Sequence, residues 1–409
     1  MSATETAFDF CTPARVVFGA GKRAEAGKLA RSLGRRAFVV NGSSTLARNG
    51  GLDEILRALW AAEVDAVVIT NCLREPEVAD VDLLVTRLRE AQAGPEDLVV
   101  GLGGGSAIDL AKAGAALVTQ AADSSVLDYL EGVGRGLKLN ATPLPVFAIP
   151  TTGGTGSEAT KNAVISSYDP PFKKSLRSEL MVPRIVLIDP ELSVSVPPQI
   201  TAWTGLDAIT QLLESGISKR ATPITQRLVS AGLELALPHL AEAYRNGSSI
   251  RARGAMAQAA FLSGLALANS GLGMAHGVAA ALGVHCRVPH GLACAVLLPV
   301  ALRVNRELPA VEAQLAKMSR DLHQAEAAAL PSAESQAFTR ASVREQADAI
   351  IEKIETLLTE LQIPRTLSEI GVRAAQIPEL VRDSRGNSMS GNPRELTDAE
   401  LTSILEALL

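Results

Sequence analysis

The sequence predicts two domains, an α/β domain built on a parallel sheet and an all-helical domain after it. In the first half, short runs of wholly apolar residues alternate with segments of helical periodicity. Continuous apolar strands are typical of a parallel sheet that is covered on both faces. Beyond the Pro197-Pro198 pair, strand-like runs are scarce and Ala, Leu, Glu and Arg recur at helical spacing. The 409 residues are enough for two or three domains. We place the domains at 1–196 and 197–409.

The strands of the predicted sheet are marked by apolar runs that end in polar or glycine-rich turns. The runs lie at 37–40, 66–69, 98–102, 145–150 and 185–188. Helices are expected between the first three runs, around 52–59 and 81–88, and a further helix begins near Gln199 or Thr201. Because parallel sheets bind ligands at the carboxyl ends of their strands, the turns after these runs are the candidate binding positions.

Composition excludes several classes of function. There are 39 Lys and Arg against 44 Asp and Glu, and aromatic residues make up only 3%. Nucleic-acid binding is therefore not expected, since it needs basic surfaces and often aromatic stacking. The four cysteines include no Cys-x-x-Cys pair and predict no disulfide framework. The polar start of the chain shows no signal-peptide pattern, so we expect a cytoplasmic protein.

The stretch from Gly254 to Cys286 has no charged residue and is long enough to cross a bilayer. Polar residues such as Gln258 and Asn269 lie within it, and Gly271-Leu272-Gly273 interrupts it. We therefore predict two buried helices and no membrane segment.

Two glycine turns follow successive strands and suit a dinucleotide. Gly103-Gly104-Gly105-Ser106 precedes a helix, whose N-terminus supplies positive potential for a diphosphate. The turn from Pro150 to Glu158 adds hydroxyls and free backbone amides. Each turn alone is also compatible with a purely structural loop, and the two together favour nucleotide binding.

The helical half contains a candidate metal site. Asp207 and Gln211 are four residues apart and share a helix face, while His276 and His290 lie fourteen apart. An aspartate and two histidines can hold Fe²⁺ or Zn²⁺ and leave a position for a substrate oxygen. A single histidine is more often structural, so the prediction depends on the set.

Together these segments resemble the iron-containing (group III) alcohol dehydrogenases. The resemblance runs from Arg15 to about Pro299 and is carried by five segments: Gly103–Ser106, Thr151–Glu158, Asp189–Leu192, Gly205–Ala208 and Pro289–Gly291. It implies a Rossmann-like N-terminal domain and a helical C-terminal domain, an architecture shared with dehydroquinate synthase, with the active site between them. It also implies NAD(P)-dependent interconversion of alcohols with aldehydes or ketones, no nucleic acid or membrane partner, and a homodimer or larger assembly.

The chain departs from the family pattern at two histidine positions. The resemblance makes Asp207, Gln211, His276 and His290 the metal positions, but the family carries histidine where Gln211 stands. A further family histidine is replaced by Ala280, and we consider His285 as a partial replacement. Because an amide oxygen is a weaker ligand than imidazole, the metal is expected to be weakly held, exchanged for a harder cation, or absent.

The turn after the first apolar run bears on the choice of cofactor. It reads Asn41-Gly42-Ser43-Ser44 and lacks the acid that bonds the ribose of NAD(H), so NADP(H) is favoured over NAD(H). The candidate cofactor-binding residues are Asn41, Gly42, Ser43, Ser44, Gly103, Gly104, Gly105, Ser106, Asp109, Thr151 and Thr152. Lys161, beside Asn162, stands where many family members have an uncharged residue, and it suggests an anionic substrate.

The leading hypothesis is hydride transfer between nicotinamide and a small carbonyl substrate. A cation on Asp207, His276 and His290 polarises the carbonyl, and Gln211 either completes the ligand shell or donates its amide N–H. Without a metal, His276 or His290 acts as general acid, and the sequence does not decide between these versions. Three alternatives stay open: a metal-independent reductase like maleylacetate reductases, a lyase like dehydroquinate synthase, and a nucleotide-binding protein without catalysis.

Overall fold

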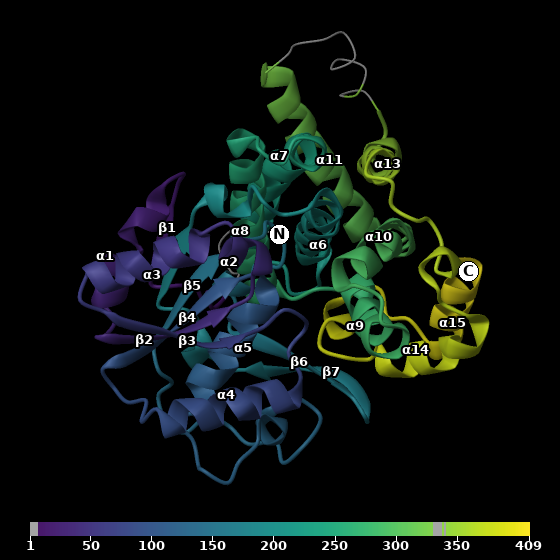
Figure 1. Cartoon of the computed structure of the whole chain (residues 1–409). Helices are drawn as coiled ribbons and strands as arrows, with labels where there is room; N and C mark the ends of the chain where they lie inside the picture. The colour runs from purple at the N-terminus through teal and green to yellow at the C-terminus, as the bar shows by residue number, and fades with distance from the viewer. Residues whose placement is uncertain (1–6, 330–337, 339–340) are drawn as a thin grey trace.

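A six-stranded parallel sheet forms the centre of the N-terminal half (Figure 1). The computed structural model describes residues 7–329, 338 and 341–409, so the polar start of the chain lies outside the described residues. The strand order is β1-β8-β5-β4-β2-β3. The strands are β1 (Arg15–Phe18), β2 (Arg36–Asn41), β3 (Asp65–Asn71), β4 (Asp97–Gly103), β5 (Val146–Pro150) and β8 (Ile185–Ile188). Every predicted strand is present, and β1 adds an edge strand.

Helices cover both faces of the sheet, as the uninterrupted apolar strands required. On one face, α1 (Ala26–Arg31) and α3 (Gly51–Ala61) pack on side chains such as Val39 and Val100. On the other face, α4 (Val78–Glu90) and α5 (Gly105–Leu117) pack on Phe38 and Val99. Successive residues of one strand thus enter opposite cores, which explains why all seven residues of β4 are buried.

An antiparallel hairpin, which the apolar runs did not indicate, projects from the sheet domain. It consists of β6 (Asn162–Tyr168) and β7 (Pro171–Arg177), paired from Asn162–Arg177 to Tyr168–Pro171. Strand β7 packs against helix α9 (Met274–Cys286) of the C-terminal half. The hairpin therefore connects the two halves of the molecule.

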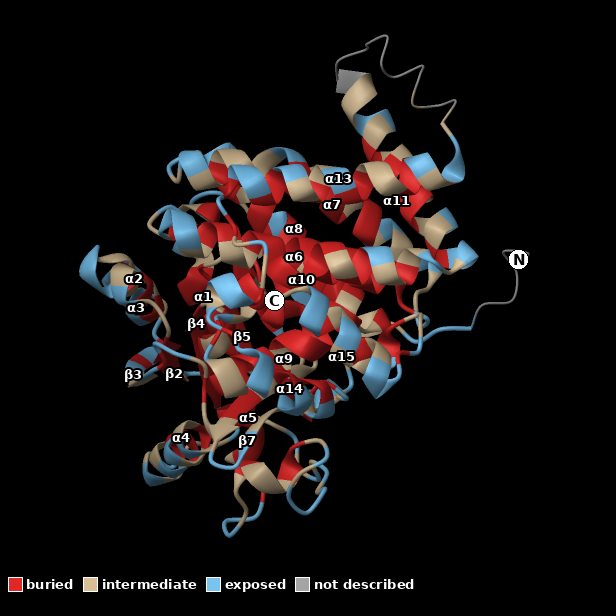
Figure 2. Ribbon diagram, turned by 90° about the vertical axis from the view of Figure 1, so that its right-hand side faces the viewer, coloured by how far each residue is buried: buried red, intermediate tan, exposed pale blue. Residues whose placement is uncertain are grey.

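The C-terminal half is all-helical, and its central helices are almost wholly buried (Figure 2). Its first helix, α6, begins at Pro198, close to the predicted start. The main helices are α6 (Pro198–Ile217), α7 (Pro223–Arg245), α8 (Ile250–Ser270), α9 (Met274–Cys286), α10 (His290–Arg306), α11 (Pro309–Ala329), α13 (Val343–Glu360), α14 (Ile377–Asp383) and α15 (Asp398–Ala407). Helices α6, α9 and α10 share one large apolar core.

The long uncharged stretch forms the two helices α8 and α9, with the break at the predicted glycines. Most of their residues are buried in the helical half, as predicted. Among the described helices, no single one is long and apolar enough to cross a membrane. Only this pair meets that test jointly, and it is bent by 102°.

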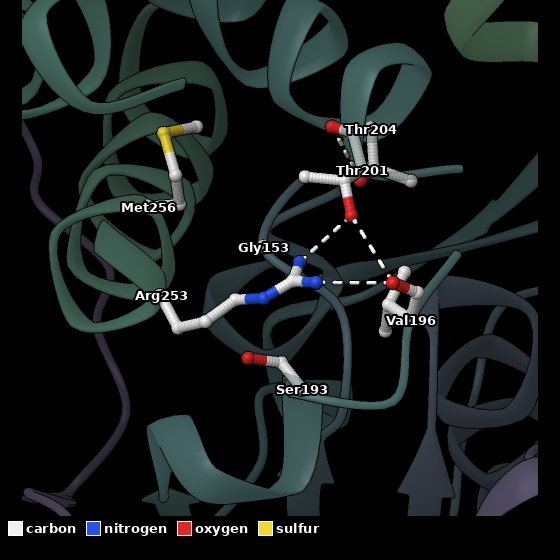
Figure 3. Close-up of a pocket in the computed structure, with 7 residues that line it drawn as sticks. All are labelled: Gly153, Ser193, Val196, Thr201, Thr204, Arg253 and Met256. Atoms are coloured by element: carbon white, nitrogen blue, oxygen red, sulfur yellow. Dashed lines mark hydrogen bonds between the residues drawn. The ribbon is translucent and has the colours of Figure 1, made fainter. Parts of the chain in front are cut away.

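A buried arginine holds the connection between the two halves (Figure 3). Arg253 of α8 donates to the carbonyl of Val196 at 3.0 Å, to Oγ1 of Thr201 at 2.7 Å and to the carbonyl of Gly247 at 2.9 Å. The cavity beside it measures about 10 Å³, too small for a ligand. Arg253 is therefore a structural clamp on the segment that leads into α6.

Candidate functional site

Three turns meet at the carboxyl ends of β2, β4 and β5. The amide of Gly42 donates to the carbonyl of Leu102 at 2.8 Å, and the amide of Thr151 donates to the carbonyl of Gly103 at 2.9 Å. A Cβ on Gly103, where φ is +155°, would lie 2.8 Å from Cα of Gly42. Because the chain reverses its direction across the sheet between β2 and β4, these turns lie at the switch point where such sheets bind nucleotides.

The N-terminus of α5 opens beside these turns. Gly104 at its N-cap provides no side-chain cap, so the first backbone amides of the helix are free to receive an anion. The second glycine turn packs directly on this end, since a Cβ on Gly105 would lie 2.6 Å from Oγ1 of Thr155. The two glycine turns, which are far apart in sequence, therefore form one surface.

Four metal-ligating side chains gather where α6, α9 and α10 meet. The ligand atoms of Asp207, His276, His290 and Cys294 all lie within 4.8 Å of one another. Nε2 of His276 is 3.1 Å from Oδ1 of Asp207, and Nε2 of His290 is 3.9 Å from the same oxygen. Asp207, His276 and Cys294 are buried, whereas the side chain of His290 keeps 28% of its surface exposed. Three of the four predicted metal residues thus converge, and Cys294 joins them.

Glu214, two helical turns after Asp207, fixes the orientation of His276. Its carboxylate accepts from Nδ1 of His276 at 2.7 Å and from the amides of Gly273 and Ala275 at 3.0 and 2.6 Å. It therefore caps the start of α9 and turns Nε2 of His276 towards Asp207. A carboxylate behind a histidine is the usual outer support of a metal-binding imidazole.

Gln211 lies beside Asp207, where a hydrogen bond from its side chain helps to lower the pKa of that carboxyl, and it is also held by neighbouring elements. Its Oε1 accepts from the hydroxyl of Ser263 at 2.6 Å, and its Nε2 donates to the carbonyl of Thr155 at 3.2 Å. The amide thereby links α6 to α8 and to the second glycine turn. Its oxygen is occupied by a hydrogen bond from within the protein.

Comparisons with known proteins agree with this geometry. The model of the family described as iron-containing alcohol dehydrogenase matches residues 13–190, and the C-terminal model of the Fe-containing alcohol dehydrogenase family matches 201–409. The chain belongs to the iron-containing alcohol dehydrogenase family. It is accordingly an oxidoreductase that acts on the CH–OH group and interconverts alcohols with carbonyl compounds, using a nicotinamide dinucleotide.

Similar members of this family act on different alcohols and aldehydes. Long-chain-alcohol dehydrogenase 1 of Geobacillus thermodenitrificans is 32% identical, over 92% of this chain and 90% of that protein. Sulfoacetaldehyde reductase of Bilophila wadsworthia is 30% identical, over 98% and 99%. The crystal structure of a 1,3-propanediol oxidoreductase, 28% identical, covers 99% of this chain and 100% of its own, with a TM-score of 0.88.

The electrostatics of the four-residue cluster favour a cation. Burial opposes the charge of Asp207, yet the hydrogen bond from His276 and the nearby histidine rings hold its pKa below the ordinary value. Burial likewise opposes a charge on His276, but Cys294, Asp207 and Glu214 raise its pKa well above the ordinary value. Burial, reinforced by the charge of Lys173, lowers the pKa of His290 to about 4. Asp207 is thus ionised and His290 neutral at pH 7, the states in which both bind metals, whereas His276 has to release a proton before its Nε2 can bind one.

The turn after β2 contains the residues predicted to choose the cofactor. The side-chain amide of Asn41 donates to Oδ1 of Asn71 at 2.8 Å, and Oγ of Ser43 accepts from the amide of Leu46 at 3.1 Å. Both side chains therefore stabilise the turn itself. Ser44 is the first residue of the short helix α2 (Ser44–Arg48).

Asp109 lies in a buried ionic network between α5, the second glycine turn and the hairpin. Its carboxylate accepts from the hydroxyl of Ser157 and, at 2.9 Å, from the amide of Val164, and it lies 3.0 Å from Nζ of Lys112. Burial lowers the pKa of Lys112, although Asp109 opposes the shift. Asp109 therefore ties α5 to the second glycine turn and to the hairpin.

The residues predicted for the substrate occupy separate places. Nζ of Lys161 is 3.3 Å from Glu179, and the buried Oδ1 of Asn162 has no hydrogen-bond partner among the described residues. His285 does not join the cluster of four: its Nε2 lies 2.7 Å from Asp383 of α14. The lysine whose charge acts on His290 is Lys173 of the hairpin, which is paired with Glu75 at 2.6 Å.

Two functional residues were missed in the sequence, and both carried a helical signal. Glu214 follows Asp207 by seven residues, which places it two turns further along one face. Cys294 follows His290 by four residues, one turn further along α10. Neither spacing is decisive until the fold shows which face of each helix meets the others.

Proposed function

We propose that this chain reduces small aldehydes, or oxidises the corresponding alcohols, at the junction of the glycine turns and the cluster of Asp207, His276, His290 and Cys294. The proposal is carried by one observation: α6, the helix that carries Asp207, packs directly on the second glycine turn. Asp207 is one helical turn from Gln211, whose amide bonds Thr155, and Thr155 contacts the start of α5.

The residues of the N-terminal half are proposed to bind the dinucleotide. The free amides at the start of α5, with Gly104, Gly105 and Ser106, hold the diphosphate. Thr151 and Thr152 follow β5 on the side of the helical domain and flank the nicotinamide end. Bound nicotinamide supplies or accepts the hydride; the turns fix its position relative to the cluster.

The cluster fits a divalent cation by its donor set. Two imidazole nitrogens and one carboxylate oxygen converge, and Glu214 pre-orients one of the rings. When bound, such a cation supplies Lewis acidity towards a carbonyl oxygen. The contribution of the protein is to keep Asp207 ionised and His290 neutral. Fe²⁺ and Zn²⁺ both suit these three donors.

We propose NADP(H) as the preferred cofactor, with support only from the turn after β2. Residues 41–48 contain no acid, so nothing there repels a 2′-phosphate, and Arg48 ends helix α2. Among the relatives, a Bifidobacterium kashiwanohense sulfoacetaldehyde reductase of known structure was crystallised with NAD⁺, and a Bacillus methanolicus relative is named an NAD-dependent methanol dehydrogenase. Initial rates with NADPH and NADH at equal concentration decide the choice.

We propose an anionic aldehyde as the substrate class, with Lys161 as the recognising cation. A relative that acts on sulfoacetaldehyde, itself an anion, supports the class. Lys161→Ala is expected to raise KM for sulfonate- or carboxylate-bearing aldehydes at least about tenfold and to leave neutral aldehydes unchanged. Lys174→Ala, on the hairpin, is the matched control. An equal loss on neutral aldehydes would show that Lys161 has no role in charge recognition.

The main experiment measures metal content and activity on one preparation. Protein purified without added metal or chelator is analysed for bound metal, and NADPH oxidation is followed with neutral and anionic aldehydes. About one Fe or Zn per chain, with activity lost on chelation and restored by the metal, is expected. Full activity without metal would show that His276 or His290 acts as the general acid in place of a cation. No oxidation with any aldehyde would contradict the proposed reaction. Light scattering on the same sample tests the homodimer that we expect from the family.

A further inference from the structure

A cysteine joins the cluster of Asp207, His276 and His290. The sulfur of Cys294 lies 3.7 Å from Nε2 of His290, and the residue has no exposed surface. It belongs to the group of four histidine, cysteine and acidic residues whose ligand atoms lie within 4.8 Å of one another. The donors come from three helices, so their convergence is a property of the fold and not of one local turn.

Gln211 has a different role in this chain. Its oxygen accepts the hydroxyl of Ser263 and its nitrogen donates to the carbonyl of Thr155. Metal ligation by the amide oxygen would compete with the hydrogen bond from the buried hydroxyl of Ser263. Gln211, at the position where the family carries a metal ligand, therefore joins α6 to α8 and to the second glycine turn by hydrogen bonds.

We propose that Cys294 is the fourth metal ligand, replacing the histidine that the family carries at position 211, and that the Asp207–His276–His290–Cys294 site selects Zn²⁺ over Fe²⁺. The inference rests on the proposed metal site. On binding, the metal displaces the proton of the Cys294 thiol, which is released to solvent. The resulting thiolate, two imidazoles and carboxylate combine soft, borderline and hard donors, a set that suits Zn²⁺. Two anionic ligands also balance the charge of a divalent ion inside a buried cluster.

Cobalt spectroscopy on the metal-free wild-type chain tests the ligand directly. Co²⁺ is titrated in, and a near-ultraviolet sulfur-to-cobalt charge-transfer band is expected to saturate at one Co²⁺ per chain. Cys294→Ser should abolish the band and weaken Co²⁺ binding at least about tenfold, whereas Gln211→Ala should keep the band. Cys286→Ser is the matched control, because Cys286 ends α9 outside the cluster.

A second measurement needs no variant and so does not depend on whether Cys294→Ser folds. X-ray absorption at the zinc edge of the wild-type protein should show one sulfur at about 2.3 Å. Competition between Zn²⁺ and Fe²⁺ for the metal-free chain should favour Zn²⁺ at least about tenfold.

The outcomes separate this inference from the proposed function. Co²⁺ binding without a charge-transfer band, or zinc with only nitrogen and oxygen neighbours, overturns the role of Cys294 while aldehyde reduction stands. Tighter binding of Fe²⁺ than of Zn²⁺ would overturn the proposed selectivity of the site for Zn²⁺. Absence of Co²⁺ binding overturns the whole inference, and NADPH oxidation measured separately then decides whether the reaction proceeds without metal.

Discussion

At the residue scale, Glu214 shows how a side chain that touches no substrate can control the site. Its carboxylate accepts from Nδ1 of His276 and from two amides at the start of α9. Glu214→Gln replaces one of these acceptor oxygens by an N–H group, so His276 is no longer held towards Asp207. Metal affinity is expected to fall about 10–100-fold, as measured by competition with a chelator. Glu90→Gln, on the exposed surface of α4, is the control. Unchanged affinity would contradict an orienting role for Glu214.

Glu158 should make stability depend on pH. Burial raises the pKa of its carboxyl to about 7 from the ordinary 4.5, although Lys112 opposes the shift. The folded state therefore binds the proton more tightly than the unfolded state. The stabilising contribution is complete below pH 4.5 and is lost as the pH rises through about 7. At about 1.4 kcal/mol per pKa unit, the loss amounts to about 3 kcal/mol.

Glu158→Gln tests this dependence, because the amide cannot ionise and Lys112 keeps Asp109 at 3.0 Å as its partner. The variant should match the wild type at pH 4.5 and exceed its free energy of unfolding at pH 8. Thermal midpoints measured at both pH values give the comparison. A variant that is equally destabilised at the two values would show that the charge of Glu158 is needed in the fold.

At the element scale, the sheet was predictable because strands buried on both faces leave an unmistakable apolar pattern. The helix that begins near residue 198 and the break between α8 and α9 followed from Pro197-Pro198 and Gly271-Leu272-Gly273. The hairpin β6–β7 escaped because its strands are only partly buried and include the polar residues Lys173 and Lys174. Cys294 was not predicted, because its four-residue spacing from His290 shows that the two share a helix face but not which other helices that face contacts.

The hydrogen bonds of Arg253, which connect α8 to the start of α6, are predicted to stabilise the fold. Its guanidinium joins α8 to the carbonyl of Val196 and to Thr201 in the first turns of α6. Arg253→Met keeps the length of the side chain but removes three hydrogen bonds from partly buried groups, which is expected to cost about 3 kcal/mol. Arg251→Met removes an exposed ion pair on the same helix and should cost less than about 1 kcal/mol. Denaturant midpoints of both variants measure the difference. Equal losses would argue against the clamp.

At the scale of the whole molecule, the sheet half and the helical half are packed closely against each other. A Cβ on Gly154 would lie 2.4 Å from Thr204 of α6, and one on Gly156 would lie 2.5 Å from Gly264 of α8. Gln211 and Arg253 add hydrogen bonds across the same junction. The turn that is proposed to hold the nicotinamide end is thus packed against α8 and against α6, the helix that carries Asp207.

This packing predicts one thermal transition for the whole chain, which both ligands shift. A ligand that binds only the folded state at 100 times its dissociation constant adds about 2.7 kcal/mol. Because the junction couples the domains, Zn²⁺ on the helical half and NADPH on the sheet half should each raise the same calorimetric midpoint, and together they should raise it further. A chelator should lower that midpoint and added Zn²⁺ should restore it. If two transitions appeared and each ligand moved only one, the domains would be independent, and the junction would position the site without stabilising it.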